Sequence, residues 1–525
     1  SNTMKKKTLY ILPLAMASLA MTSCVDNWLT EPSPGITKLE DFYTSGQTAL
    51  QSVNAAYTPL MWEYDGATYL CEWYIGDVMS DDALKGGQNV GDMSVVYDME
   101  NFKVQSNNAL LLGFYRAQYQ GIARCNLVLD QVAKMEPDTT MNVSLQQRIL
   151  GEASFLRALY YFRLVRVFGG VPYVDFIIDS PSKWQQPRAT AEEVYGHIID
   201  DLTFAQKTLW EKNAYAAEDL GRATKGAAEA MLLKVNLYCH NYAAAEAWGD
   251  SIISKNQYDL CADYGTNFLL EGENGIESVF EIQYMEDEMS DYGEGFGFTR
   301  GTFTTILTRT RAEDGWGFNK PTQNLYDEFE TGDPRRDLSI LNPLGDLSTV
   351  EYYLGNRYLN RKYALVTIAD GDTTYYQLKH ATRSPINTKY IRYADVLLMY
   401  AEACCENGNL AAAKEALERV RSRARNMQDD PTVLPAFPYG SYSDTPEGLR
   451  DAIRHERRVE LAMEGHRWFD LCRWGVACEV MEAYKAQESE EVRAEMGTFI
   501  KGVHELLPIP QQEIDLNPME QNPGY

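Results

Sequence analysis

The sequence lacks the short motifs by which many enzymes are recognised. It contains no G-x-S-x-G turn, no Walker loop and no H-E-x-x-H helix. Only six histidines are present, and the nine cysteines include no C-x-x-C pair. A metal or acid–base cluster therefore has few residues to draw on, and neither a zinc site nor a disulfide framework is indicated. We expect no enzymatic activity and no cofactor.

Positive charge is also scarce. The 48 lysines and arginines are outnumbered by 75 acidic residues, which gives a net charge of −27. A chain of this charge repels phosphate backbones and anionic lipid headgroups, so we expect no nucleic-acid partner. Neutral ligands such as sugars are unaffected by this field.

Long apolar runs are confined to the N-terminus. Lysines at positions 5–7 precede an apolar stretch over 9–20, which is too short to cross a bilayer. This layout predicts a signal peptide over residues 1–23, where residues 1–3 ahead of Met4 are a cloning remnant or an upstream start. The sequence Met21-Thr22-Ser23-Cys24 resembles a bacterial lipobox, which implies lipidation of Cys24. The alternative is an ordinary signal peptide cut near Cys24.

Helical periodicity dominates the rest of the chain. Apolar residues recur at three- and four-residue spacing over 46–62, 108–134 and 145–168. Two helical hairpins, 224–254 and 390–424, carry an alanine cluster at the start of their second helix, as tetratricopeptide repeats do. Two further pairs are predicted, 46–62 with 108–134 and 145–168 with 190–210. The predicted fold is mainly α: a tetratricopeptide-like helical repeat scaffold with long irregular loops and a few short strands.

Two irregular excursions interrupt this scaffold. The first excursion, 65–107, and the second excursion, 258–389, are rich in glycine, aspartate and aromatic residues. In the second, 362–368 and 373–378 flank Asp370-Gly371, which predicts a β-hairpin. Long irregular insertions between scaffold helices commonly carry function.

Several longer segments occur in a recognisable order. They are GEASFLRALYYF at 151–162 with FGGVP at 168–172, YADVLLMYAEA at 393–403, ERRVEL at 456–461 with EGHRWFDLCRW at 464–474, and LPIPQQEI at 507–514 before NPMEQNPGY at 517–525. Together with the lipobox, they resemble the SusD/RagB family over the whole mature chain.

The resemblance implies a single domain over 24–525, with halves 24–257 and 258–525, and four repeat-like helix pairs decorated by ligand-binding loops. It also implies a lipid-anchored outer-membrane protein at the cell surface, which captures oligosaccharides and delivers them to a SusC-like TonB-dependent transporter. Two other functions stay open. One is RagB-like capture of peptides for a peptide importer. The other, less favoured, is glycoside hydrolysis, which needs only two carboxylates.

Both excursions offer residues suited to sugars. A pyranose stacks its C–H face on an aromatic plane and needs fixed donors and acceptors at its hydroxyls. The glycan-binding candidates, among which Trp73 and Tyr292 are preferred, are Trp73, Tyr74, Asp81, Asn89, Tyr284, Tyr292, Phe296 and Trp316. Core packing is the alternative role for each of the aromatic residues, and for Trp316, between Gly315 and Gly317, the alternative is a place in the structural framework. Clustered carboxylates at Glu286, Asp287 and Asp291 are a weaker candidate for a calcium site, and a solvated acidic loop is the alternative.

Charges of alternating sign mark one late segment. At helical spacing around Gly465 stand Arg457, Glu460, Glu464, Arg467, Asp470 and Arg473. This pattern predicts a partly buried ion network that joins two helices, a structural role rather than a chemical one.

Overall fold

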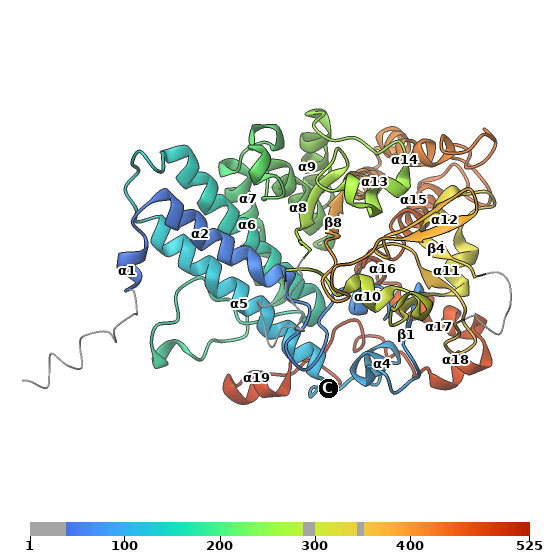
Figure 1. Ribbon diagram of the computed structural model, residues 1–525, viewed down its shortest axis with the longest axis horizontal. Coiled ribbons are helices and arrows are strands. Elements are labelled where there is room, and N and C mark those ends of the chain that lie inside the picture. The colour runs from blue at the N-terminus through green and yellow to red at the C-terminus, as the bar shows by residue number, and fades with distance from the viewer. Residues whose placement is uncertain (1–37, 287–299, 344–350) are drawn as a thin grey trace, which may run out of the picture.

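The computed structural model describes residues 38–286, 300–343 and 351–525. The predicted signal peptide and Cys24 lie outside the described residues, as do Tyr292, Phe296, Asp287 and Asp291. Figure 1 shows an elongated body with a bundle of long helices at one end and shorter helices and strands at the other. No described helix is both long enough and apolar enough to span a membrane. The eight described cysteines form no disulfide with one another.

The first half of the scaffold is a layer of long helices. Consecutive helices pack side by side (Figure 1): α2 (Gly46–Tyr57), α5 (Ala109–Val132), α6 (Val143–Phe168) and α7 (Ala191–Thr208). Helix α6 is buried on nearly every side because α2, α5 and α7 all contact it. It ends at Gly169, which adopts a positive φ of 74° that favours glycine. Both predicted early pairs, α2 with α5 and α6 with α7, are thus confirmed.

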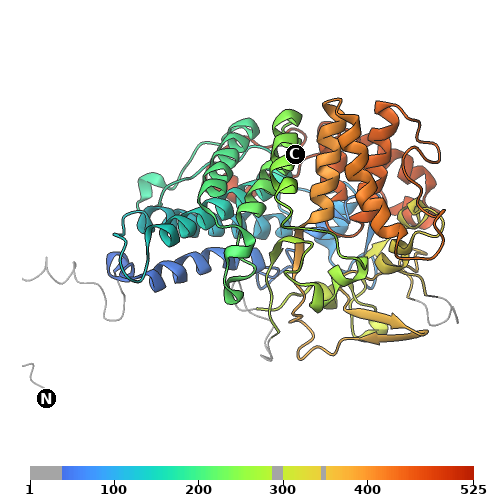
Figure 2. The same cartoon turned by 90° about the horizontal axis from the view of Figure 1, so that it is seen from above.

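The two predicted hairpins form as well. They are α8 (Lys225–Tyr238) with α9 (Tyr242–Ser254), and α13 (Tyr393–Glu406) with α14 (Leu410–Arg425). Ala245 and Ala413, one from each alanine cluster, are fully buried. Helix α9 packs on α13, so the green and orange helices of Figure 2 lie side by side. A methyl group at Gly249 would meet the Tyr400 ring at 2.4 Å, which shows how closely α9 and α13 approach.

Short strands join the excursions to one another. The described residues form two-stranded antiparallel ladders: β1 (Ala83–Gly86) with β3 (Phe318–Pro321), β2 (Ser278–Ile282) with β8 (Thr388–Arg392), β4 (Ile340–Leu341) with β5 (Leu359–Asn360), and β6 (Val366–Ala369) with β7 (Asp372–Tyr375). The last pair is the predicted hairpin, which turns at Asp370-Gly371. The β1–β3 ladder connects the first excursion to the second across more than two hundred residues of sequence.

Shorter helices complete the fold. They are α1 (Leu39–Phe42), α3 (Trp73–Gly76), α4 (Ser94–Glu100), α10 (Thr304–Thr308), α11 (Gln323–Glu328), α12 (Pro334–Ser339), α15 (Pro446–Glu460), α16 (Arg467–Arg473), α17 (Ala477–Gln487), α18 (Glu490–Glu495) and α19 (Gln511–Leu516). One continuous apolar core runs from α2 to the C-terminal segment. We therefore describe the scaffold and excursions as one packed body.

The predicted ion network exists and extends beyond two helices. Its centre is Glu460, which is fully buried and contacts Arg335 and Arg392 at 2.8 Å and also Arg423. The other predicted members also pair: Arg457 with Asp395 and Asp470, Glu464 with Arg392 and Lys362, and Arg473 with Glu402 and Asp470. Burial would raise the pKa of Glu460, but Arg423, Arg392 and Arg335 hold it well below its usual range.

Candidate functional site

A buried carboxylate holds the two excursions together. Glu63 is 6% exposed and accepts hydrogen bonds from the Tyr284 hydroxyl at 2.8 Å, the Thr302 hydroxyl at 2.7 Å and the Phe303 N–H at 2.7 Å. Burial raises the pKa of Glu63, although these hydrogen bonds oppose the shift. The segment after Glu63 is therefore fixed against the segment that contains Phe303.

Next to this contact four aromatic rings come together. Phe303 is fully buried, the partly exposed rings of Tyr64 and Tyr69 pack on it, and the partly exposed ring of Trp316 packs on Tyr69. The ring centroids of Tyr64 and Tyr69 are 4.9 Å apart, and Tyr69 lies 5.3 Å from Phe303 and 5.6 Å from Trp316. We call Tyr64, Tyr69, Phe303 and Trp316 the aromatic platform. Its rings come from the start of the first excursion and the middle of the second.

Polar groups border the aromatic platform. Arg311 donates to the Trp316 carbonyl at 3.2 Å, and the Glu351 carboxylate accepts from the Arg311 N–H at 2.9 Å and from the Thr310 hydroxyl at 3.0 Å. The Asp65 carboxylate beside Tyr64 accepts the N–H groups of residues 67 and 68. Partly exposed rings with fixed polar neighbours can stack a sugar face and bond its hydroxyl edge.

Trp316 is the predicted glycan-binding candidate that lies on the platform. Trp73 and Tyr284 instead line a separate, partly open cavity of about 70 Å³. The Trp73 indole N–H donates to the Thr304 hydroxyl at 3.2 Å, and its ring lies 4.0 Å from that of Tyr74. Both rings are partly exposed, as those of Tyr64, Tyr69 and Trp316 are, so Trp73 and Tyr284 stay glycan-binding candidates.

Two other candidates, Tyr74 and Asp81, are buried and cannot contact a ligand as predicted. Tyr74 is fully buried, so its ring offers no face to a ligand. Asp81 is 2% exposed, and its carboxylate accepts two bonds from Arg467, at 2.8 and 2.9 Å, and lies 3.1 Å from Arg458. Burial would raise the pKa of Asp81, but Arg458 and Arg467 lower it to about 2. Asp81 is thus a structural anion that docks the first excursion on the C-terminal helices.

Asn89 and Glu286 are surface positions. Asn89 is exposed on the loop after β1, where its side-chain oxygen accepts the Gly91 N–H at 2.9 Å. The Glu286 carboxylate accepts from the Tyr376 hydroxyl at 2.9 Å and from the Lys379 N–H at 2.8 Å. Because Asp287 and Asp291 lie outside the described residues, the calcium site stays a prediction.

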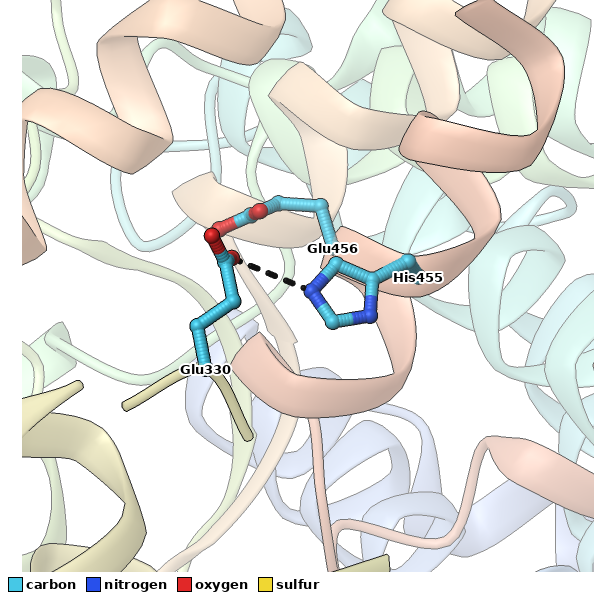
Figure 3. Close-up of side chains that lie close together, drawn as sticks. All are labelled: Glu330, His455 and Glu456. Carbon is cyan, nitrogen blue, oxygen red and sulfur yellow. Dashed lines mark hydrogen bonds and ion pairs between the residues drawn. The ribbon is translucent and has the colours of Figure 1, made fainter. Parts of the chain in front are cut away.

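One cluster in the described residues has the spacing of metal ligands. Side-chain atoms of Glu330, His455 and Glu456 lie within 4.8 Å of one another (Figure 3). Burial lowers the pKa of His455, but its bonds to Glu328 at 2.8 Å and Glu330 at 3.2 Å outweigh this and raise it to about 9. Arg335 and Arg421 contact Glu456. An imidazolium has no lone pair to give, and the carboxylates are already neutralised, so the cluster fits an ion network rather than a metal.

Sequence reasoning missed the tyrosines of the platform. We placed the start of the first excursion at residue 65, whereas Tyr64 and Tyr69 flank the turn that begins there and bridge to each other. The available signal was the density of aromatic residues from Trp62 to Tyr74, which includes five rings in thirteen residues. Neither residue type nor spacing shows which of those rings face outward.

The comparisons with known proteins agree with this architecture, a helical-repeat scaffold that presents aromatic loops. The model of the SusD family matches residues 276–525, and the model described as starch-binding associating with outer membrane matches residues 37–237. The chain belongs to the SusD/RagB family, as its sequence motifs predicted.

Named relatives cover most of the chain. SusD-like protein P2 of Formosa agariphila is 26% identical over 536 residues, with 98% of this chain and 99% of the relative covered. The starch-binding protein SusD of Bacteroides thetaiotaomicron is 26% identical over 459 residues, with 77% and 76% covered.

Solved structures confirm the fold. A laminarin-binding SusD-like protein superposes with a TM-score of 0.75 at 29% identity, covering 92% of this chain and all of that one. Surface glycan-binding protein A of Bacteroides thetaiotaomicron, solved with laminarihexaose, gives a TM-score of 0.74 at 25% identity, covering 91% of this chain and all of that one.

Proposed function

We propose that this chain binds oligosaccharides at the aromatic platform without hydrolysing them. It acts as a lipid-anchored protein of the outer-membrane surface, attached through Cys24, and delivers its ligand to a SusC-like TonB-dependent transporter. The observation that carries the proposal is the cluster in which Tyr64 and Tyr69 pack on Phe303 and Trp316 packs on Tyr69. Partly exposed rings of this kind match the apolar face of a pyranose.

Two further facts support a neutral sugar as ligand. The net charge of −27 disfavours anions and leaves uncharged glycans unaffected. Relatives of similar fold are named for binding laminarin, laminarihexaose and starch. Laminarihexaose and maltohexaose are therefore the first ligands to test.

Binding without turnover fits the polar groups at the platform. A glycosidase needs one carboxyl group to protonate the leaving oxygen and a second to act as nucleophile or base. The Glu351 carboxylate is bonded to Thr310 and to the Arg311 N–H, and that of Asp65 is bonded to N–H groups of its own turn. Both carboxylates serve to fix the loops.

Alanine substitution tests the platform. Loss of one stacking ring costs about 1–3 kcal/mol in base-stacking proteins, so Trp316→Ala or Tyr69→Ala should weaken calorimetric binding of the hexasaccharide by roughly 5- to 150-fold. Trp184→Ala is the matched control, since Trp184 is 67% exposed and lies on the separate segment between α6 and α7. Thermal melting of each variant must stay near that of the wild type.

Other outcomes would replace the proposal. Full affinity in folded Trp316→Ala and Tyr69→Ala would remove the platform from ligand binding. Binding of oligopeptides in place of glycans would establish the RagB-like alternative, and turnover of a hexasaccharide would establish a hydrolase.

The lipid anchor is tested separately. Cys24→Ala should release the protein from the membrane fraction, whereas a Cys24→Ala variant that stays acylated and membrane-bound would reject the lipid anchor.

A further inference from the structure

A lysine ammonium is enclosed by its own loop. Lys85, on β1, is fully buried. Its ammonium donates to the carbonyl oxygens of Gly86 at 2.8 Å, Asn89 at 3.1 Å and Asp92. An ammonium has three N–H groups, so each of them meets one carbonyl of the loop over residues 86–92.

Two aromatic rings complete the enclosure. The ammonium lies 5.5 Å from the centroid of Phe318 and 5.0 Å from that of Tyr353, both within the range of cation–π attraction. Two carboxylates also attract the ammonium without a hydrogen bond to it: Glu100, which accepts the Lys85 backbone N–H at 3.0 Å, and Asp92, which accepts the Gln88 N–H at 2.8 Å. The cation is thus held by loop carbonyls and rings, as a bound metal or ammonium ion would be.

The loop needs this cation to keep its shape. Three carbonyl oxygens that converge on one point repel one another unless a positive charge lies between them. An apolar side chain could fill the same volume without the cost of burying an ammonium, but it would leave those oxygens unpaired. The charge of Lys85 therefore has a function that simple packing does not explain.

The enclosed loop borders the aromatic platform. The Gly87 N–H donates to the Gly317 carbonyl at 3.0 Å, next to Trp316, and Gly86 pairs with Phe318 in the β1–β3 ladder. Gln88 and Asn89 at the tip are exposed. Exposed amide side chains of this kind are suited to hydrogen-bonding sugar hydroxyls.

We propose that Lys85 is a tethered cation that orders the loop over residues 86–92 and thereby fixes the amide edge of the glycan site. Lys85 is a positioning residue, because its ammonium is buried and its hydrogen bonds go to the loop carbonyls. The effect on glycan affinity rests on the function proposed above. The ordering of the loop does not, so the two can be tested apart.

The test compares two variants by two measurements. Lys85→Met keeps most of the side-chain volume and removes the charge, and Lys85→Ala removes the atoms from Cγ to Nζ, which n-propylammonium can replace. Loop order is read from hydrogen exchange of four amides that donate hydrogen bonds: Gly87 to the Gly317 carbonyl, and Gln88, Gly91 and Asp92 to acceptors within the loop. Glycan affinity is read by calorimetry with whichever hexasaccharide the wild type binds.

We expect both variants to exchange the loop amides at least tenfold faster, with α6 unchanged, and to bind the hexasaccharide at least fivefold more weakly. Millimolar n-propylammonium should restore both properties in Lys85→Ala, whereas neutral 1-propanol should not. The amine should have no effect on Lys85→Met, because the methionine side chain still fills the site. If Lys85→Met does not fold, Lys85→Ala alone tests the inference: rescue by n-propylammonium but not by 1-propanol would show that the charge orders the loop.

Three results would overturn the inference. The first is unchanged loop exchange in folded Lys85→Met, and the second is equal rescue of Lys85→Ala by the amine and the alcohol. The third is a loosened loop with undiminished hexasaccharide affinity, which would reject the positioning role. A wild type that binds no glycan, combined with a loop that loosens in Lys85→Met, would reject the proposed function and retain the ordering role.

Discussion

Removing the charge at the centre of the ion network should destabilise the whole scaffold. In Glu460→Gln the side chain keeps its shape, but its contacts with Arg335, Arg392 and Arg423 lose one partner charge. All three guanidinium groups are buried. Water therefore cannot replace the anion that the substitution removes, and the positive charges are less well compensated.

The size of the effect follows from what remains. Arg335 keeps Asp333 and Glu456, while Arg392 and Arg423 both keep Glu277. Each guanidinium therefore still has at least one buried carboxylate partner. The glutamine oxygen can also still accept a hydrogen bond. Breaking a buried pair outright costs about 3–5 kcal/mol, so we expect a loss of about 3 kcal/mol in the free energy of unfolding.

Urea unfolding followed by circular dichroism measures this loss. Glu479→Gln is the matched control, because Glu479 is ion-paired with Lys501 but 59% exposed, and its midpoint should not move measurably. Because the carboxylate of Glu460 has a lowered pKa, its stabilising effect is present above about pH 4.5 and is lost as the pH falls through the folded-state pKa. An unchanged midpoint in Glu460→Gln at pH 7 would refute a stabilising role for this carboxylate.

Two further predictions concern the same scaffold. His455 has a pKa raised to about 9. It therefore contributes about 3 kcal/mol that is fully present below pH 6.5 and lost as the pH rises to 9. Urea midpoints should fall over that range in the wild type and stay flatter in His455→Gln; parallel pH profiles would contradict this. Leu398→Ala, at a fully buried position on α13, should cost about 2–5 kcal/mol in the same assay, and an unmoved midpoint would disprove the packing of α13.

The helical scaffold was predictable because its signals are local. The period of apolar residues predicts α6, and the alanines at Ala245 and Ala413 predict close helix pairs, since small side chains permit that approach. The turn at Asp370-Gly371 likewise predicts its hairpin from a few neighbouring residues. In each case the physical cause lies within one or two turns of the chain.

The candidate site was predicted less well because its causes are distant in sequence. Asp81 has the residue type of a sugar ligand, but its partner Arg467 lies 386 positions away, and nothing near Asp81 indicates that pairing. Trp73 and Tyr74 differ in exposure because the single turn α3 points one ring inward and leaves the other partly covered. Trp316 was among the predicted candidates, whereas its neighbour Tyr69 was not.

The contacts that place the excursions are polar and buried, whereas the platform itself consists of rings. Asp81 docks on Arg467, Asp77 accepts the Gly465 N–H at 2.8 Å, and Glu63 accepts the Phe303 N–H at 2.7 Å. Such bonds have fixed directions and are costly to leave unmade, so they determine where the loop backbone lies. The rings of Tyr69 and Trp316 contribute contact area without setting that backbone. Substitutions of these rings should therefore change which sugar binds while the loop backbone keeps its position. The same buried polar contacts can thus support different ligand-binding surfaces.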